Sequence, residues 1–432
     1  MALIDLGDVR EESGPEPGLR APRAVGRPAR VAAALVLTLV SLAGAAPAAQ
    51  PTSFTVPAGP ATTAFLQDDR LFLMEPMDAP AGRDGQLTAY AVPAAGNGPL
   101  APLWRAPLPV TRPDGGVYVR GDLVVVTGGS FEDGPRRAFA FDLDTGRLRW
   151  QWRGDVLPAG PDLLVLDLVG EESGTASSVD AATGQVRWSV PTPEEATSYR
   201  VRADGIDRIV VSRSSGQVEV WDARSGARLR SANVRPGELP VHHRAQPVDD
   251  LLLVVRDNAA LVTAYGLDGL DRRWEIRLGL VAYVNACGPL LCAYGQTGGM
   301  WALDPATGAV RWRVTRWRAA LTEQDGRMLV AGPAADGQDS FAVLDTATGR
   351  VVADLGTWTL AGGYPAEGPL IGVRPAGGDR LLVAELDTAG GRIRALDVLA
   401  GVAGVAGDCQ AGARLLACRR GAGAYGVWRL DR

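Results

Sequence analysis

The sequence predicts an all-β fold that is assembled from repeated antiparallel hairpins. A motif of the form Ala-x-Asp-x-x-Thr-Gly-x-x-x-Trp occurs twice without change, over 140–150 and 302–312. A third copy over 178–188 has Ser178 in the alanine position. After residue 50 no helical pattern of 3.6-residue period runs for longer than a turn or two. A motif that recurs in this way indicates an array of similar structural units.

Each copy of the motif predicts a strand, a tight turn and a second strand. Apolar and polar residues alternate before the Asp, as they do in a half-buried strand. The Asp carboxylate can accept hydrogen bonds inside its own turn, and the Gly supplies the positive φ that a short hairpin requires. The Trp is then expected to lie over a neighbouring unit and bury about 150–250 Å². The predicted docking residues are Asp142, Gly146, Trp150, Asp180, Gly184, Trp188, Asp304, Gly308 and Trp312.

Degenerate copies of the motif fill the rest of the chain. Arg230, Ala353 and Ala395 stand where the Trp is expected, and Gly266 and Leu270 replace the Asp and Gly in the unit that ends at Trp274. The strand before each turn recurs near Tyr90, Phe141, Val179, Trp221, Tyr265, Leu303, Leu344, Leu386 and Trp428. This spacing gives eight complete units and a ninth without its last strand. A strand over 53–56 could complete the ninth unit.

The motif and its copies resemble the PQQ-like, or quinoprotein-dehydrogenase-like, β-propeller repeat, and the resemblance extends from about Ala61 to the C-terminus. It implies an all-β propeller of four-stranded antiparallel blades. Eight blades are usual in this family, so we favour eight and leave nine open. The family includes dehydrogenases that hold pyrroloquinoline quinone and the scaffold lipoprotein of the bacterial outer-membrane assembly machinery. The resemblance therefore implies one fold but does not single out one activity.

The N-terminal region predicts the compartment. Four arginines between residues 20 and 30 precede an apolar stretch over 31–49, and no charge follows until Asp68. We expect residues 1–30 to be cytoplasmic and disordered, 31–49 to form one hydrophobic helix that anchors the chain in the cell membrane, 50–60 to be a linker and 61–432 to form the propeller outside the cytoplasm. The alternative is a cleaved signal peptide and a secreted propeller.

The four cysteines fit an oxidising compartment. Cys287 with Cys292, and Cys409 with Cys418, occupy matching places in two units, each pair across the turn between the first two strands. We expect two hairpin disulfides, with four buried free thiols as the alternative.

Composition argues against nucleic acid as a partner. All 44 basic residues are arginine, which we attribute to the codon bias of a high-GC bacterium, and the formal net charge is −5. No basic patch is interleaved with aromatic residues.

The sequence predicts no catalytic, cofactor-binding or metal-binding residue. The only histidines are the adjacent pair His242 and His243 in a Pro-flanked loop. The acidic pairs at 68–69, 171–172, 194–195 and 249–250 are expected to be solvated, with a calcium site as the alternative. The dehydrogenases that the chain resembles clamp their quinone with adjacent cysteines, and this chain has no Cys-Cys pair.

We therefore expect a monomeric, non-catalytic propeller that acts outside the cytoplasm as a scaffold for an envelope or secreted protein, with the membrane contacted only through the N-terminal segment. The alternative is a quinoprotein oxidoreductase that depends on pyrroloquinoline quinone and calcium.

Overall fold

The structure is a computed structural model that describes residues 53–77, 84–110, 115–129, 136–169, 173–192, 197–213, 215–234, 244–256, 260–334, 338–362, 370–402, 408–420 and 423–430. All of these residues fall within one compact unit, Pro51–Arg432. The predicted cytoplasmic segment 1–30 and the predicted anchor 31–49 lie outside the described residues. Among the residues that are described, no helix has the length and apolarity needed to span a membrane.

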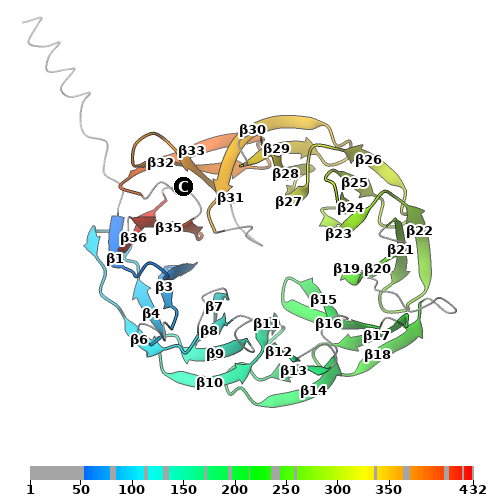
Figure 1. Cartoon of the computed structure of the whole chain (residues 1–432), viewed down its shortest axis with the longest axis horizontal. Coiled ribbons are helices and arrows are strands. Elements are labelled where there is room, and N and C mark those ends of the chain that lie inside the picture. Colours follow the sequence, from blue (N-terminus) through cyan, green and yellow to red (C-terminus); the bar gives the residue numbers. More distant parts are fainter. Residues whose placement is uncertain are drawn as a thin grey trace, which may run out of the picture. The chain divides into compact units, whose positions relative to one another are not determined.

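The described residues form antiparallel blades that follow one another around a ring, and the first strands of blades 2 to 7 lie nearest the centre (Figure 1). Blades 1 to 3 are β2 (Thr63–Gln67), β3 (Arg70–Glu75), β4 (Gln86–Ala91) and β6 (Trp104–Pro107); β7 (Val117–Arg120), β8 (Leu123–Gly128), β9 (Arg137–Asp142) and β10 (Leu148–Arg153); and β11 (Asp155–Ala159), β12 (Asp162–Val169), β13 (Ser173–Val179) and β14 (Val186–Thr192). Blades 4 to 6 are β15 (Thr197–Arg202), β16 (Gly205–Ser212), β17 (Gln217–Asp222) and β18 (Arg228–Asn233); β19 (Arg244–Val248), β20 (Leu251–Arg256), β21 (Leu261–Gly266) and β22 (Arg272–Arg277); and β23 (Val281–Cys287), β24 (Leu290–Gly295), β25 (Met300–Leu303) and β26 (Val310–Val314).

Blades 7 and 8 share strand β30 (Val351–Leu360), and blade 9 takes one strand from the N-terminal region. Blade 7 consists of β27 (Ala319–Gln324), β28 (Arg327–Pro333), β29 (Asp339–Asp345) and β30 (Val351–Leu360). The end of β30 also starts blade 8, where it pairs with β31 (Leu370–Pro375), followed by β32 (Arg380–Asp387) and β33 (Arg392–Ala400). Blade 9 contains β34 (Cys409–Ala411), β35 (Leu415–Arg420) and β36 (Ala424–Arg429), and its outer strand is β1 (Ser53–Pro57).

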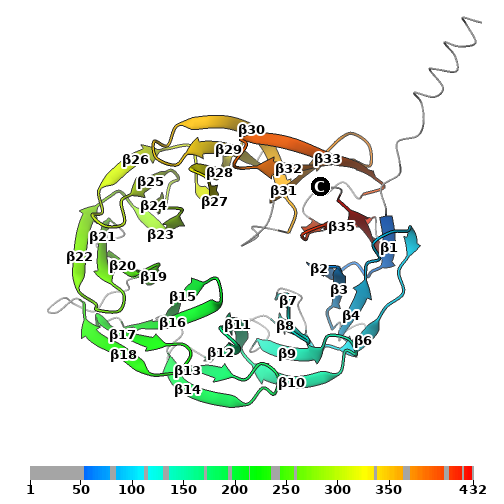
Figure 2. The same cartoon turned by 180° about the vertical axis from the view of Figure 1, so that it is seen from behind.

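The ring closes through this N-terminal strand. β1 pairs antiparallel with β36, with Ser53 opposite Trp428 and Pro57 opposite Ala424, and the two lie together in both views (Figures 1 and 2). β1 also pairs with the short β5 (Gly98–Pro99) of the following loop. The pairing is favourable because it buries Phe54 and Val56 and covers the edge that β36 would otherwise expose.

Two expectations are therefore corrected. The described residues contain nine blades, so the preference for eight, which came from the usual blade number of the family, is wrong and the count of nine units is right. The segment 50–60, expected to be a linker, contains β1, so the propeller begins at Ser53 and not at Ala61. In both cases the reason is the same, because strand β1 completes a blade that begins more than 350 residues later in the chain.

The hydrophobic core lies between neighbouring blades. One cluster, for example, joins Phe72 and Leu87 of blade 1 to Val124 and Phe139 of blade 2, and all four side chains are buried. Each blade thus stabilises the next by apolar contact, as expected for a repeat architecture.

Two disulfides hold the first hairpins of blades 6 and 9. Cys287 is bonded to Cys292 across β23 and β24, and Cys409 is bonded to Cys418 across β34 and β35. This is the predicted pairing. Disulfides of this kind are typical of proteins outside the cytoplasm.

Candidate functional site

The repeated Asp-x-x-Thr-Gly turns position the blades, because a Trp of one blade lies on the turn of the next. Trp312 of blade 6 is buried, and its indole N–H donates a 2.9 Å hydrogen bond to the carbonyl of Thr346 in the turn of blade 7. Gly349 in that turn has φ +69°, and a Cβ there would stand 2.6 Å from the indole. Glycine is required at this position for both reasons, its positive φ and the close approach of the ring.

The same contact recurs at four other junctions. The indoles of Trp104, Trp150, Trp188 and Trp274 lie against Gly146, Gly184, Gly226 and Gly308, and each donates to a carbonyl of the facing turn. Trp150 is buried, whereas Trp188, which was expected to be buried, is only half-buried. The neighbouring outer strand β18 is almost entirely exposed, so it gives Trp188 little cover.

The Asp of each motif organises its own turn, as the sequence suggested. Asp304 accepts hydrogen bonds from the backbone N–H and the hydroxyl of Thr307, both at 3.0 Å, and from Arg311. These bonds, that of Arg311 first, hold the pKa of Asp304 below its ordinary value. Asp142 and Asp180 make the same contacts with Thr145 and Thr183.

Two further buried Trp residues were not identified from the sequence. Trp317 and Trp358 both lie where the chain passes from one blade to the next, and Trp358 is 1% exposed. Its indole lies against Gly372 of blade 8 and joins the buried cluster between blades 7 and 8, whereas the turn glycine Gly391 faces only the Cβ of Ala353. No repeat motif marks either residue, and their signal in the sequence is limited to the bulk of the side chain.

At the junction between blades 4 and 5, ion pairs cross from one blade to the other. Blade 4 has Arg230 at the Trp position, and the facing turn of blade 5 has Leu270, with φ +54°, at the Gly position. Arg200 of β15 reaches across the junction to Asp250, with Nη1 2.9 Å from Oδ1, and Arg208 of β16 reaches Asp268, with Nε 3.1 Å from Oδ1. These ion pairs add to the buried apolar cluster that joins the two blades.

We call the ion pairs of Arg200 and Arg208 across this junction the clamp, and Arg200 is its central residue. Its side chain is 6% exposed and forms two hydrogen bonds, of 2.8 and 2.6 Å, with the carboxylate of Asp207. Burial raises the pKa of Asp207, but the hydrogen bonds and charge of Arg200 outweigh it, so the net pKa of that carboxyl is lowered. The bidentate geometry is the strong form of an Arg–carboxylate pair.

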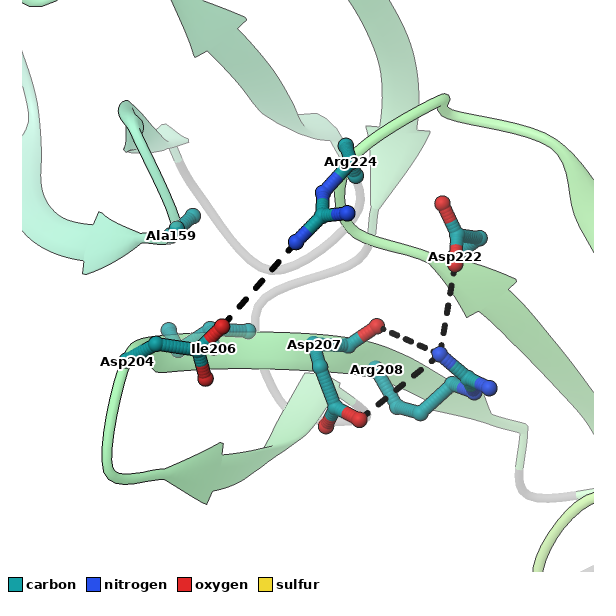
Figure 3. Close-up of a pocket in the computed structure, with 8 residues that line it drawn as sticks. Ala159, Asp204, Ile206, Asp207, Arg208, Asp222 and Arg224 are labelled. Carbon is teal, nitrogen blue, oxygen red and sulfur yellow. Dashed lines mark hydrogen bonds and ion pairs between the residues drawn. The ribbon is translucent and has the colours of Figure 1, made fainter.

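Next to the clamp, a polar recess of about 240 Å³ opens between blades 3 and 4 (Figure 3). It is lined by Ala159, Gly160, Asp204, Ile206, Asp207, Arg208, Asp222 and Arg224. Figure 3 shows Arg208 between Asp207 and Asp222, and its Nη1 lies 3.2 Å from Oδ2 of Asp222. Arg224 points across the recess toward Asp204, at 3.9 Å, and 71% of its side chain is exposed. Arg224 is therefore the loosely held cation of the site.

The residues weighed as metal ligands are only partly described. His242 and His243, and the acidic pairs 171–172 and 194–195, lie outside the described residues. Asp249 and Asp250 are paired with Arg200 and Arg202, so the positive charge beside them is supplied by arginine. Asp68 and Asp69 form the turn between β2 and β3.

Comparison with known proteins identifies the family of this propeller. A family profile described as outer membrane protein assembly factor BamB matches residues 83–266 and 258–404. No curated protein matches the chain in sequence.

Comparison with solved structures finds matches of low sequence identity over much of the chain. BamB from Moraxella catarrhalis is 15% identical with a TM-score of 0.43, and the match covers 87% of this chain and 98% of that one. The computationally designed Ika8 protein is 15% identical with a TM-score of 0.48, covering 72% and 95%. A europium-containing methanol dehydrogenase is 12% identical with a TM-score of 0.42, covering 85% and 84%.

Proposed function

Because the chain belongs to the PQQ-like β-propeller family whose profile is described as outer membrane protein assembly factor BamB, we propose that it is a non-catalytic scaffold that binds a partner protein outside the cytoplasm, at the cell envelope. The family description supports an assembly role, and the two disulfides support an oxidising compartment. In this proposal the apolar segment 31–49 anchors the monomeric propeller to the cell membrane.

The observation that carries the proposal is that the guanidinium of Arg224 is exposed and weakly paired. Three other charged groups that line the recess are engaged, since Arg208 binds Asp222 at 3.2 Å and Asp207 binds Arg200 at 2.6 Å. Among the described residues, the guanidinium of Arg224 has only the 3.9 Å ion pair with Asp204, so a carboxylate of a partner can bind it at small cost. Arginine is favoured in protein interfaces because its planar fork binds carboxylates through two hydrogen bonds.

The residues present do not fit a quinone enzyme. The resemblance implies a clamp of adjacent cysteines over the cofactor, whereas Cys287 and Cys409 are each bonded to a cysteine of their own hairpin. The acidic pair of blade 5, which could have contributed to a calcium site, is bound by arginine. The proposal therefore assigns no redox step to this chain.

The experiment compares crosslinking of the full-length protein in its native envelope with that of two charge-reversal variants. Arg224→Glu should lower the yield of the partner adduct at least about fivefold, since a like charge then faces the partner carboxylate. Arg350→Glu, an exposed arginine of the blade 7 turn, is the matched control and should leave the yield unchanged. Equal yields from all three proteins would show that Arg224 is not in the interface.

A second assay addresses the enzyme alternative directly. The purified full-length protein is incubated with pyrroloquinoline quinone and Ca²⁺, and dye reduction is followed with alcohols and sugars. We expect no saturable binding and no turnover. Turnover that saturates with the quinone would replace the scaffold proposal with an oxidoreductase.

A further inference from the structure

The junction between blades 4 and 5 has an open groove at the position where five other junctions seat an indole. The groove has a volume of about 540 Å³ and is lined by five consecutive residues of β18, Arg228 to Ala232, together with Gly269 and Leu270 of blade 5. Leu270 is buried in the cluster beneath the junction and forms the floor of the groove, whereas Arg230 is exposed. The ion pairs of Arg200 and Arg208 hold the two blades together without filling this space.

The walls of the groove are basic. Arg228 and Arg230 are the only charged residues among the described residues that line it. Arg228 is bound to Glu219 at 3.2 Å, and Arg230 has no ion pair with any residue that the structure describes. Between them Leu229 is 44% exposed. An occupant that complements this surface carries negative charge and some apolar surface.

The shape of the groove selects an extended occupant. β18 pairs only with β17 among the described strands, so its outer edge presents unpaired backbone N–H and C=O groups along the groove. A peptide in β conformation can pair with such an edge and place alternate side chains toward the blade.

We propose that this groove is the docking site for an extended acidic segment of a partner protein, and that an aromatic side chain of that segment packs in the groove over the side chain of Leu270. This inference rests on the proposed scaffold function and names the surface and the chemistry of the partner. At the other junctions the seated ring donates to a carbonyl of the facing turn, as Trp274 does to Pro305 at 2.8 Å. A partner Trp over Leu270 gains the same burial of apolar surface, about 150–250 Å², and the flanking acidic groups pair with Arg230 and Arg228.

The test measures fluorescence anisotropy of a fluorescein-labelled peptide that has one tryptophan between two acidic residues on each side. The full-length protein should bind this peptide saturably. A peptide with serine in place of the tryptophan should bind at least about tenfold more weakly, and a peptide with basic flanks should not bind. Absence of binding by the acidic peptide, or equal affinity for all three, would overturn the proposal.

Variants of the chain then locate the site. Arg230→Glu should weaken binding at least about tenfold. The double variant Arg230→Trp with Leu270→Gly rebuilds the docking motif of the other junctions and should abolish binding while the protein remains folded by circular dichroism. Arg313→Glu, on the exposed outer strand of blade 6, is the matched control and should bind as the parent does. Unchanged affinity in the double variant would show that the peptide binds elsewhere.

The outcomes also separate this inference from the scaffold proposal. If the acidic peptide does not bind but Arg224→Glu still reduces the partner adduct in the envelope, the groove is wrong and the scaffold function stands. If the adduct is insensitive to Arg224→Glu and the quinone assay shows turnover, the scaffold function itself fails.

Discussion

Removal of one docking indole should destabilise the propeller by several kcal/mol. Trp312 is 8% exposed and donates a 2.9 Å hydrogen bond to Thr346. Burial of about 150–250 Å² of ring surface at about 25 cal/mol per Å² corresponds to about 4–6 kcal/mol, an upper value because the unfolded chain already hides part of this surface. The lost hydrogen bond adds about 1 kcal/mol. Trp312→Ala should therefore lower the free energy of unfolding by about 3–5 kcal/mol, as large core aromatic truncations do.

The facing glycine allows a matched test of the same contact. Gly349 and Gly326 have similar positive φ angles, +69° and +74°, but only Gly349 faces an indole, whereas a Cβ at Gly326 meets no atom within 4 Å. Gly326→Ala should cost about 1–2 kcal/mol through backbone strain alone, and Gly349→Ala should cost more because its Cβ would lie 2.6 Å from the ring of Trp312. The assay is equilibrium denaturation with urea. Equal losses for the two glycine variants, together with a loss under about 1 kcal/mol for Trp312→Ala, would refute the docking argument.

The remaining predictions concern ring closure, the charged clamp and pH. Phe54→Ala removes a buried side chain of the closing strand and should destabilise by about 3 kcal/mol in urea denaturation, whereas a loss near zero would mean that β1 does not close the ring. Arg200→Ala leaves Asp207 without its buried partner and should cost about 3 kcal/mol, with Arg200→Lys as the control that keeps the charge but not the bidentate fork. The pKa of Asp304 is lowered by Arg311 in the folded state, so the stability this carboxylate contributes is present above its ordinary pKa of about 3.9 and is lost as pH falls through the folded value. Below about pH 4, the free energy of unfolding of Asp304→Asn should therefore fall less steeply with decreasing pH than that of the parent protein. An equally steep fall in both proteins would contradict this assignment.

The hairpins of this protein could be predicted from the sequence because the forces that make them are local. The Asp, Thr and Gly of each turn bond within a few residues of one another, as Asp304 and Thr307 do, so they leave a fixed spacing in the chain. Both disulfides also close short hairpins, and the matching places of their cysteines in two units indicated the pairing. The spacing of the strands indicated eight complete units and a ninth without its last strand, and the family was implied by the resemblance of the motif.

The features that distinguish this propeller from a regular array were decided by tertiary structure. The sequence named the strand over 53–56 only as a candidate to complete the ninth unit, and the packed ring pairs it with β36. Trp358 packs against Gly372 of blade 8 from outside the repeat motif. The clamp joins Arg200 to Asp250, and the groove beside Arg230 exists only because Leu270 of another blade forms its floor. These contacts join residues tens to hundreds of positions apart, and their energies depend on burial and charge geometry that exist only after the blades have packed. The repeat in the sequence reflects the local hydrogen bonds of each turn. The contacts that differ from one blade junction to the next form only when the blades pack together.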